Sequence, residues 1–384
     1  MTNVRSILSY LKSQHESMIQ YLESLVILES PSGDPEAQQT IFMMLKRSFE
    51  VLDYHVVVVP GRKTGGYFYA RPANKIKGAD FQLLVGHCDT VWQLHTLDKM
   101  PFVREESKVR GPGVYDMKAG LTQILFALKT IREMDLQWDL MPVILINSDE
   151  EIGSRESTPI IKRLAKLARR ALVLEPPLGI EGKLKTARKG LGRFEIRIIG
   201  KPAHAGLDPG GGASAIMELS HQIQRIFALN DPAKGISVNV GLIEGGVSAN
   251  VIAPESSAVI DVRVSTVEDG EHISKVIHAL EVVNPETKII VKGSIGRPPM
   301  EPTARNQKLW ERARSLGTKM GLKLEEATAG GGSDGNTTSQ YTATLDGLGT
   351  TGDGAHALHE YIFENKIRER TALLTLLLMQ EDLD

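Results

Sequence analysis

The stretch FQLLVGHCDT (residues 81–90) is an apolar run that ends in polar side chains. The same form recurs in PVILINSDEE (142–151) and in ALVLEPP (171–177). An apolar run of this length, bounded by polar residues, is typical of a strand buried within a parallel sheet. Between the first two runs lies the helical pattern DMKAGLTQILFALKTIREM (116–134). Strands that alternate with helices predict an α/β domain with helices on both faces of its sheet.

Strand-like and helical segments extend this pattern in both directions. HVVVVP (55–60) and GYFYARP (66–72) read as strands, and residues 4–28 repeat apolar side chains at helical spacing. Towards the C-terminus we expect a helix near 304–321 and a last helix from about 363. The sequence therefore predicts a mixed, largely parallel sheet in a first domain.

Residues 187–300 follow a different pattern and read as an inserted domain. We expect a half-exposed strand in RFEIRIIG (193–200), then a Gly-rich turn and a helix over roughly 212–229. Two strands follow in ISVNVGLIEGG (236–246) and SAVIDVRVS (257–265). A second helix in TVEDGEHISKVIHALEVV (266–283) and a last strand in TKIIVKG (287–293) complete the domain. This β-α-β-β-α-β order is the ferredoxin-like arrangement of one antiparallel sheet with two helices. The prolines of GRPPMEPT (296–303) would lead the chain back, so that residues 1–186 and 301–384 form one domain.

Composition excludes several classes of protein. The chain has 384 residues, which is long for a single core, and 41% of them are hydrophobic. The formal net charge of −2 and the absence of a basic run give no reason to expect nucleic-acid or membrane-surface binding. The charged N-terminus lacks the apolar region of a secretory signal, and no apolar stretch is long enough to span a bilayer. With one cysteine, no intramolecular disulfide can form, and we expect a cytoplasmic protein.

Side chains able to bind or orient a metal follow several of the apolar runs in a fixed order. They are His87, Asp89, Asp116, Glu150, Glu151, Glu175 and, far along the chain, His356. Two imidazoles with several carboxylates suit a pair of divalent cations. His356 can reach the others only if the C-terminal segment rejoins the first domain.

Each of these residues alone also has a simpler reading. His87 and Asp89, two apart in a strand, would share a face, but a strand-end His is often structural. Asp116 can be the N-cap of a helix, and Glu175 can be an acid in a loop. Glu150 and Glu151 directly follow a buried strand, where two adjacent carboxylates are costly unless a metal or protons neutralise them. The alternative for that pair is a solvated acidic loop.

The ordered set of motifs resembles the M20 family of metallopeptidases, and within it the glutamate carboxypeptidase branch. The resemblance runs from about residue 80 to the C-terminus. It depends on GHCDTVW, GPGVYDMKAG, SDEEIGS, LEPP, GKPAHAG, SANVIAP, DVRV, GGGSDGN and GAHALHEYI. It implies a catalytic domain with an inserted lid and dimerisation domain.

The resemblance also implies a role for each residue of the centre. His87 and Glu175 would bind one Zn²⁺, Glu151 and His356 would bind a second, and Asp116 would bridge the two. Asp89 would orient His87, and Glu150 would be the general base towards a water or hydroxide between the metals. Co²⁺ or Mn²⁺ are possible substitutes for zinc. The peptide bond after Asp116 is expected to be cis.

Further residues are implied in substrate binding. His204 would donate to the tetrahedral intermediate, and in related enzymes it comes from the partner subunit, so a homodimer is expected. Arg263 and Asn250 resemble the residues that bind the substrate carboxylate, and Gly331, Gly332 and Ser333 can supply further donors. Read alone, His204 is a surface histidine, Arg263 an exposed strand arginine, and the Gly-rich loop a turn.

Three positions either allow a second reading or differ between branches of the family. The spacing of His to Glu four residues later selects His356, followed by Glu360, over His359. Cys88 should face away from His87 and is expected in the core. Glu at position 175, where many branches have Asp, agrees with the carboxypeptidase branch.

The expected activity is removal of a C-terminal residue, glutamate or another acidic or small one, from a peptide or N-acyl amino acid. An N-acyl amino acid deacylase, such as a deacetylase or desuccinylase, is the alternative with the same chemistry. A non-catalytic metal-binding protein on the same scaffold is the alternative from another class.

Overall fold

The computed structural model describes residues 2–74 and 78–383, which form two compact units. The first unit holds the chain up to Ala187, Pro302–Ala329, and the residues from Ser333 on; the second holds Arg188–Glu301 and Gly330–Gly332. Within the described residues, no helix is both long and apolar enough to cross a membrane.

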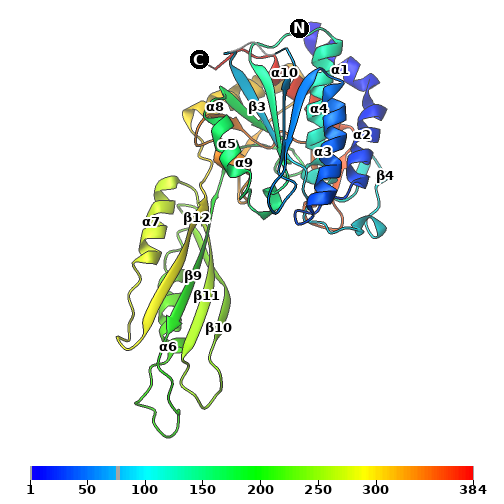
Figure 1. Ribbon diagram of the computed structural model, residues 1–384. Helices are drawn as coiled ribbons and strands as arrows, with labels where there is room; N and C mark the ends of the chain where they lie inside the picture. The colour runs from blue at the N-terminus through cyan, green and yellow to red at the C-terminus, as the bar shows by residue number, and fades with distance from the viewer. Residues whose placement is uncertain (1, 75–77, 384) are drawn as a thin grey trace. The chain divides into compact units, whose positions relative to one another are not determined.

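The first unit, which contains the strand labelled β3 in Figure 1, is built on a six-stranded sheet in the order β1-β2-β6-β3-β7-β14. The strands are β1 (Tyr54–Val59), β2 (Tyr67–Pro72), β3 (Phe81–His87), β6 (Met141–Asn147), β7 (Arg170–Val173) and β14 (Ala343–Leu345). The last four pair in parallel, whereas β1 and β2 are antiparallel to their neighbours. The predicted mixed, largely parallel sheet is confirmed.

Alternate side chains of the central strands pack on opposite faces of this sheet. Leu84 and Ile144 join the main core with helices α4 (Ala119–Glu133) and α10 (Lys366–Leu378). Leu83 and Val143 join a separate core that includes Ile161 of helix α5 (Thr158–Ala165). Because both faces are covered, the polar residues that these strands carry lie at the strand ends.

The N-terminal prediction of one helix over 4–28 was wrong. The segment forms α1 (Thr2–Ser13) and α2 (His15–Ile27), separated at Gln14, whose ψ of 0° turns the chain between them. A further helix, α3 (Pro35–Glu50), had not been predicted. Its start is explained by Asp34, whose carboxylate accepts from two N–H groups of the first turn.

Helix α4 begins at Ala119, not at Asp116 as the sequence suggested. Residues 114–118 form an irregular turn in which Asp116 has non-helical φ and ψ of −115° and 95°. Asp116 therefore does not cap a helix, and the N-cap reading is wrong. The peptide bond between Asp116 and Met117 is cis, as the family resemblance implied.

Short strands join the C-terminal segment to the rest of the first unit. A second sheet has the order β15-β16-β5-β4, and β13 pairs with β8. These strands are β4 (Val103–Glu105), β5 (Lys108–Arg110), β8 (Leu184–Arg188), β13 (Glu326–Ala329), β15 (Gly352–Asp353) and β16 (Tyr361–Phe363). Helices α8 (Ala304–Lys319) and α9 (Asp334–Thr338) complete the unit. The pairing of β16 with β5 brings the loop before Tyr361 beside the loop after Arg110.

The second unit follows the predicted ferredoxin-like order. Its elements are β9 (Gly190–Ile199), α6 (Ala215–Phe227), β10 (Ser237–Gly245), β11 (Glu255–Val264), α7 (Val267–His278) and β12 (Lys288–Arg297). The sheet is antiparallel in the order β10-β11-β9-β12, which leaves β10 and β12 as edges. Figure 1 shows α6 and α7 beside this sheet, and both contribute to its apolar core.

Candidate metal centre

Three of the predicted ligands, His87, Glu151 and Glu175, lie at or just after the ends of neighbouring parallel strands. His87 is the last residue of β3, and its partner in register is Asn147, the last residue of β6. Val173, the last residue of β7, pairs with Val85. The segments that follow β6, β3 and β7 therefore leave the sheet at the same end, where the carboxyl ends of the strands lie. This is the usual place for a site in an α/β fold.

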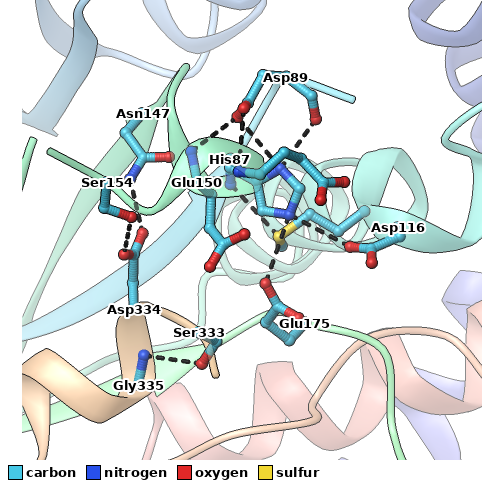
Figure 2. Close-up of polar contacts among 12 residues, drawn as sticks. His87, Asp89, Asp116, Asn147, Glu150, Ser154, Glu175, Ser333, Asp334 and Gly335 are labelled. Carbon is cyan, nitrogen blue, oxygen red and sulfur yellow. Dashed lines mark hydrogen bonds and ion pairs between the residues drawn. The ribbon is translucent and has the colours of Figure 1, made fainter. Parts of the chain in front are cut away.

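The first group of ligands consists of His87, Asp116 and Glu175. His87 Nε2 lies 3.2 Å from Asp116 Oδ1 and 3.4 Å from Glu175 Oε1. His87 and Glu175 are buried, with 1% and 7% exposure. Figure 2 shows the three side chains converging on one point, with the imidazole between the two carboxylates.

The second group consists of Asp116, Glu151 and His356. His356 Nε2 lies 3.0 Å from Glu151 Oε2 and 3.7 Å from Asp116 Oδ2. Asp116 thus turns one oxygen to each group. These are the two groups that the family resemblance had implied.

The donor set fits a pair of divalent cations. Each group offers one imidazole nitrogen and two carboxylate oxygens, which Zn²⁺ and similar cations accept. Glu151 Oε1 is buried and has no hydrogen-bond partner among the described residues. A buried carboxylate oxygen without a donor is costly, and a cation would satisfy it.

The loop before Asp116 approaches its neighbours closely. Gly113 has a φ of +71°, and a Cβ at this position would lie 2.6 Å from Thr90 Cγ2. Glycine is therefore required at the point where the loop turns towards the ligands.

Asp89 holds several parts of the centre, but not by sharing a strand face with His87. Strand β3 ends at His87, and the nearest acceptor to His87 Nδ1 is the backbone carbonyl of Asp89 at 2.9 Å; the carboxylate lies at 3.4 Å. The Asp89 carboxylate instead accepts from the N–H groups of Glu150 and Glu151, both at 3.2 Å, and from the hydroxyl of Ser32. It fixes the backbone that carries the predicted base.

A buried network supports the turn that carries Glu150 and Glu151. The side-chain amide of Asn147 and the hydroxyl of Ser154 both donate to Asp334. Figure 2 shows this network beside Glu150, whose carboxylate points away from Asp89. The predicted alternative of a fully solvated acidic loop does not describe this turn, since the Glu151 side chain is only 6% exposed, although Ile152 beside it is 51% exposed.

The carboxylates hold protons on the two histidines when no cation is present. Burial would lower the pKa of His87, but its contacts with three carboxylates outweigh this and raise the pKa well above its ordinary value. The ion pair with Glu151 raises the pKa of His356 to about 9. A cation that binds either group must displace a proton from the imidazole.

In the second unit, His204 and Asn250 lie on neighbouring segments. His204 forms a bridge with Val251, and Ala205 N–H donates to the Asn250 carbonyl. The exposed ring of His204 accepts at Nδ1 from the N–H groups of Gly206 and Leu207, both at 3.1 Å. These two bonds place the ring proton on Nε2, which is left as a donor.

Arg263 is the second-last residue of β11, at the end of the strand opposite to Asn250. Its guanidinium makes two hydrogen bonds to Asp261, with Nε 2.8 Å from Oδ2 and Nη2 3.2 Å from Oδ1. Its register partner on β9 is Leu191, whose side chain a Cβ at Gly332 would meet at 2.8 Å. Arg263 and the Gly331–Gly332 segment therefore belong to the same end of this sheet.

Ser333 uses its hydroxyl within the protein. It is fully buried, accepts from Gly335 N–H at the start of α9, and donates to Asp346. Cys88 is buried in the main core, as expected for a residue that faces away from the centre.

Several supporting residues had not been singled out from the sequence. Ser32, Asn147, Ser154 and Asp334 contact the centre through hydrogen bonds that join distant parts of the chain. Asn147, Ser154 and Asp334 stand in the quoted stretches PVILINSDEE, SDEEIGS and GGGSDGN, but none of them was given a role, and Ser32 lies outside every quoted stretch. Nothing in the local pattern marks a serine or asparagine as the partner of a carboxylate so far along the chain.

Known proteins resemble this chain in both sequence and fold. Residues 186–287 match the model of the M20 peptidase dimerisation domain. The chain is 30% identical to carboxypeptidase G2 of Pseudomonas sp. (strain RS-16), over 95% of this chain and 89% of that protein. It is 28% identical to acetylornithine deacetylase of Myxococcus xanthus, over 51% and 53%. The structure of aminopeptidase PepT from Bacillus cereus ATCC 10987 shares the fold, with a TM-score of 0.79 at 20% identity over 95% of this chain and 98% of that one.

We expect metal binding to release protons. Between the ordinary histidine pKa of about 6.5 and the pKa of about 9 for His356, the metal-free centre holds protons that a cation displaces, so apparent affinity should rise with pH across this range. Titration calorimetry in two buffers of different ionisation enthalpy should give about one proton per cation near pH 7.5. An affinity that does not change over this range would contradict the assignment of the histidines as ligands.

Proposed function

The chain belongs to the M20 family of metallopeptidases, and from that premise we propose that it is a di-zinc exopeptidase. It hydrolyses the amide bond before a C-terminal amino acid in a peptide or an N-acyl amino acid. The observation that carries this proposal is the pair of ligand groups that share Asp116, with Glu150 held next to them. The single cysteine, buried Cys88, fits a reducing and hence cytoplasmic location.

Glu150 is the proposed general base. Two cations bound by the groups around Asp116 would polarise the substrate carbonyl and make water easier to deprotonate. Asp89 holds the Glu150 backbone, and neighbouring Glu151 serves as a ligand. Glu150 takes the proton from the attacking water and delivers it to the leaving amine. A protein that only binds metal does not need such a base.

His204 is the proposed donor to the oxyanion of the tetrahedral intermediate. Because its Nδ1 accepts from two backbone N–H groups, the neutral ring presents an N–H at Nε2. Asn250, on the segment paired with it, would contact the same substrate. At the other end of the sheet, Arg263 would bind the substrate carboxylate, in competition with its present partner Asp261.

The distance along β11 supports a homodimer. Asn250 precedes the strand, and between Glu255 and Arg263 the chain rises roughly 26 Å at about 3.3 Å per residue. A substrate as small as an N-acyl amino acid cannot contact both ends of one such sheet. If His204 and Arg263 serve one active site, they must come from different subunits.

An exposed apolar surface offers a place for that contact. It consists of the edge strand β10 with the loop that follows it and the start of α6, and its exposed residues are Ile216, Met217, Leu242, Ile243 and Val247. An unpaired edge strand with large apolar side chains favours pairing with another chain. A second copy of this unit is the proposed occupant, in agreement with the family match of residues 186–287.

A deacylase is the second candidate function. The similarity to an acetylornithine deacetylase covers 51% of this chain and favours it. The same ligands and base would serve both reactions. The candidates differ only in which side of the amide bond is recognised.

Replacing the base should separate metal binding from turnover. Glu150→Gln keeps the size of the side chain but cannot take a proton, so we expect both cations to remain bound while kcat falls about 100- to 10,000-fold. Glu151→Gln is the matched control, which should lose metal because Glu151 is a ligand. Metal content by emission spectroscopy and initial rates test this. Undiminished kcat in Glu150→Gln would mean that another group is the base.

Mixing two inactive variants should restore activity if the subunits share active sites. A dimer with one His204→Ala subunit and one Glu150→Gln subunit has one complete site, formed by Glu150 of the first and His204 of the second. Random exchange makes half of the dimers mixed, so activity should reach about a quarter of wild type. Each variant alone is the control. A mixture that exchanges subunits but stays as inactive as its components would show that His204 acts within its own subunit.

A substrate panel distinguishes the two candidate functions. Dipeptides and N-acyl amino acids would be compared, with the acyl group and the C-terminal residue varied separately. For the exopeptidase we expect kcat/KM to depend mainly on the C-terminal residue, with dipeptides accepted. Turnover limited to one small acyl group would establish the deacylase instead. Hydrolysis that persists after chelation would contradict both.

A further inference from the structure

Glu360 has a fully buried side chain that the mechanism above does not use. Its Oε1 accepts from the N–H groups of Tyr115, at 2.9 Å, and Asp116, at 3.0 Å. Its Oε2 accepts from Gly113 N–H at 3.0 Å and from the indole N–H of Trp92 at 2.9 Å. A carboxylate has about four lone-pair sites, and here each one receives a donor.

Strand pairing explains how Glu360 reaches this loop. Tyr361, the first residue of β16, pairs with Arg110, the last residue of β5. Glu360 therefore stands beside the start of the loop that leads to Asp116. His356, four residues before Glu360, has a positive φ of 61°.

The contacts of Glu360 join three segments that carry ligands. Trp92 follows the segment of His87, and Gly113 to Asp116 form the loop that carries the shared ligand. Glu360 itself is four residues from His356. One carboxylate thus holds segments from both ligand groups, and three of its four donors are main-chain N–H groups whose positions set the direction of Asp116.

We propose that Glu360 is a positioning residue. By accepting hydrogen bonds from the N–H groups of residues 113, 115 and 116, it holds Asp116 in the orientation that directs one oxygen to each metal site. It belongs to neither proposed ligand group, and both of its oxygens already accept hydrogen bonds from these donors. The inference rests on the proposed two-metal centre, since Asp116 needs a fixed direction only if it serves two cations. Such supporting contacts around metal ligands commonly change metal affinity or activity by about 10- to 100-fold when removed.

The variant Glu360→Gln tests the need for four acceptor sites. Its amide oxygen can accept from two of the donors, but its NH₂ group then faces the other two. Glu364→Gln is the matched control on the same segment, because Glu364 pairs with His15 and Arg104 and not with the Asp116 loop. Trp92→Phe removes one donor only and provides a milder second variant.

Amide hydrogen exchange in the metal-free protein measures the positioning directly. We expect Glu360→Gln to speed exchange at residues 113–116 about 10-fold or more, with strand β3 unchanged. The control should match wild type. This readout does not depend on hydrolysis, so it separates a failure of this inference from a failure of the proposed function.

Metal binding provides the second readout. In Glu360→Gln we expect affinity for Co²⁺ or Zn²⁺ to fall about 10- to 100-fold, the visible spectrum of the Co²⁺ form to change, and kcat to fall more than KM changes. Trp92→Phe should produce the same spectral change in weaker form, which keeps the test valid if Glu360→Gln does not fold. Wild-type exchange at 113–116 together with wild-type metal affinity and spectrum in Glu360→Gln would overturn the proposal. If Glu360→Gln does not fold, an unchanged spectrum in Trp92→Phe would do so.

Discussion

The arrangement depends on one carboxylate, Asp116, which turns its two oxygens towards two different imidazoles. Around it, Glu151 and Glu175 add negative charge where buried strands end. Carboxylates gathered in a region of low water content repel one another unless cations or protons lie between them. In the metal-free state the two histidines supply those protons, and the same geometry would accept two divalent cations in their place.

The rest of the first unit keeps these charges in position. Asp89 fixes the backbone of Glu150 and Glu151. Asp334 supports the same turn by accepting hydrogen bonds from Asn147 and Ser154, which lie on either side of it. Glu360 holds the loop of Asp116 from another side. These three carboxylates accept from N–H and O–H donors, so each is satisfied without a metal. The carboxylates of the proposed ligands are therefore the ones whose charge a bound cation would neutralise.

Much of this grouping of side chains could be predicted from the sequence because three of the proposed ligands follow recognisable strands. In a parallel sheet the carboxyl ends of neighbouring strands meet, so His87, Glu151 and Glu175 had to lie close together once the strands were identified. The grouping of ligands and the cis bond after Asp116 came from the family resemblance, not from spacing.

What could not be predicted depends on contacts between distant residues. The bonds from Ser32 to Asp89 and from Asn147 to Asp334 follow from tertiary register, and nothing local signals them. The same holds for the break at Gln14 and the irregular turn at Asp116, where helical periodicity continues through positions that are not helical.

The most direct test of the shared-carboxylate centre is anomalous diffraction at the zinc absorption edge from crystals of the zinc-loaded protein. The account predicts two peaks about 3.5–4 Å apart, one beside His87 and Glu175 and the other beside Glu151 and His356, with an oxygen of Asp116 on each. One peak only, or two peaks of which Asp116 contacts just one, would contradict it.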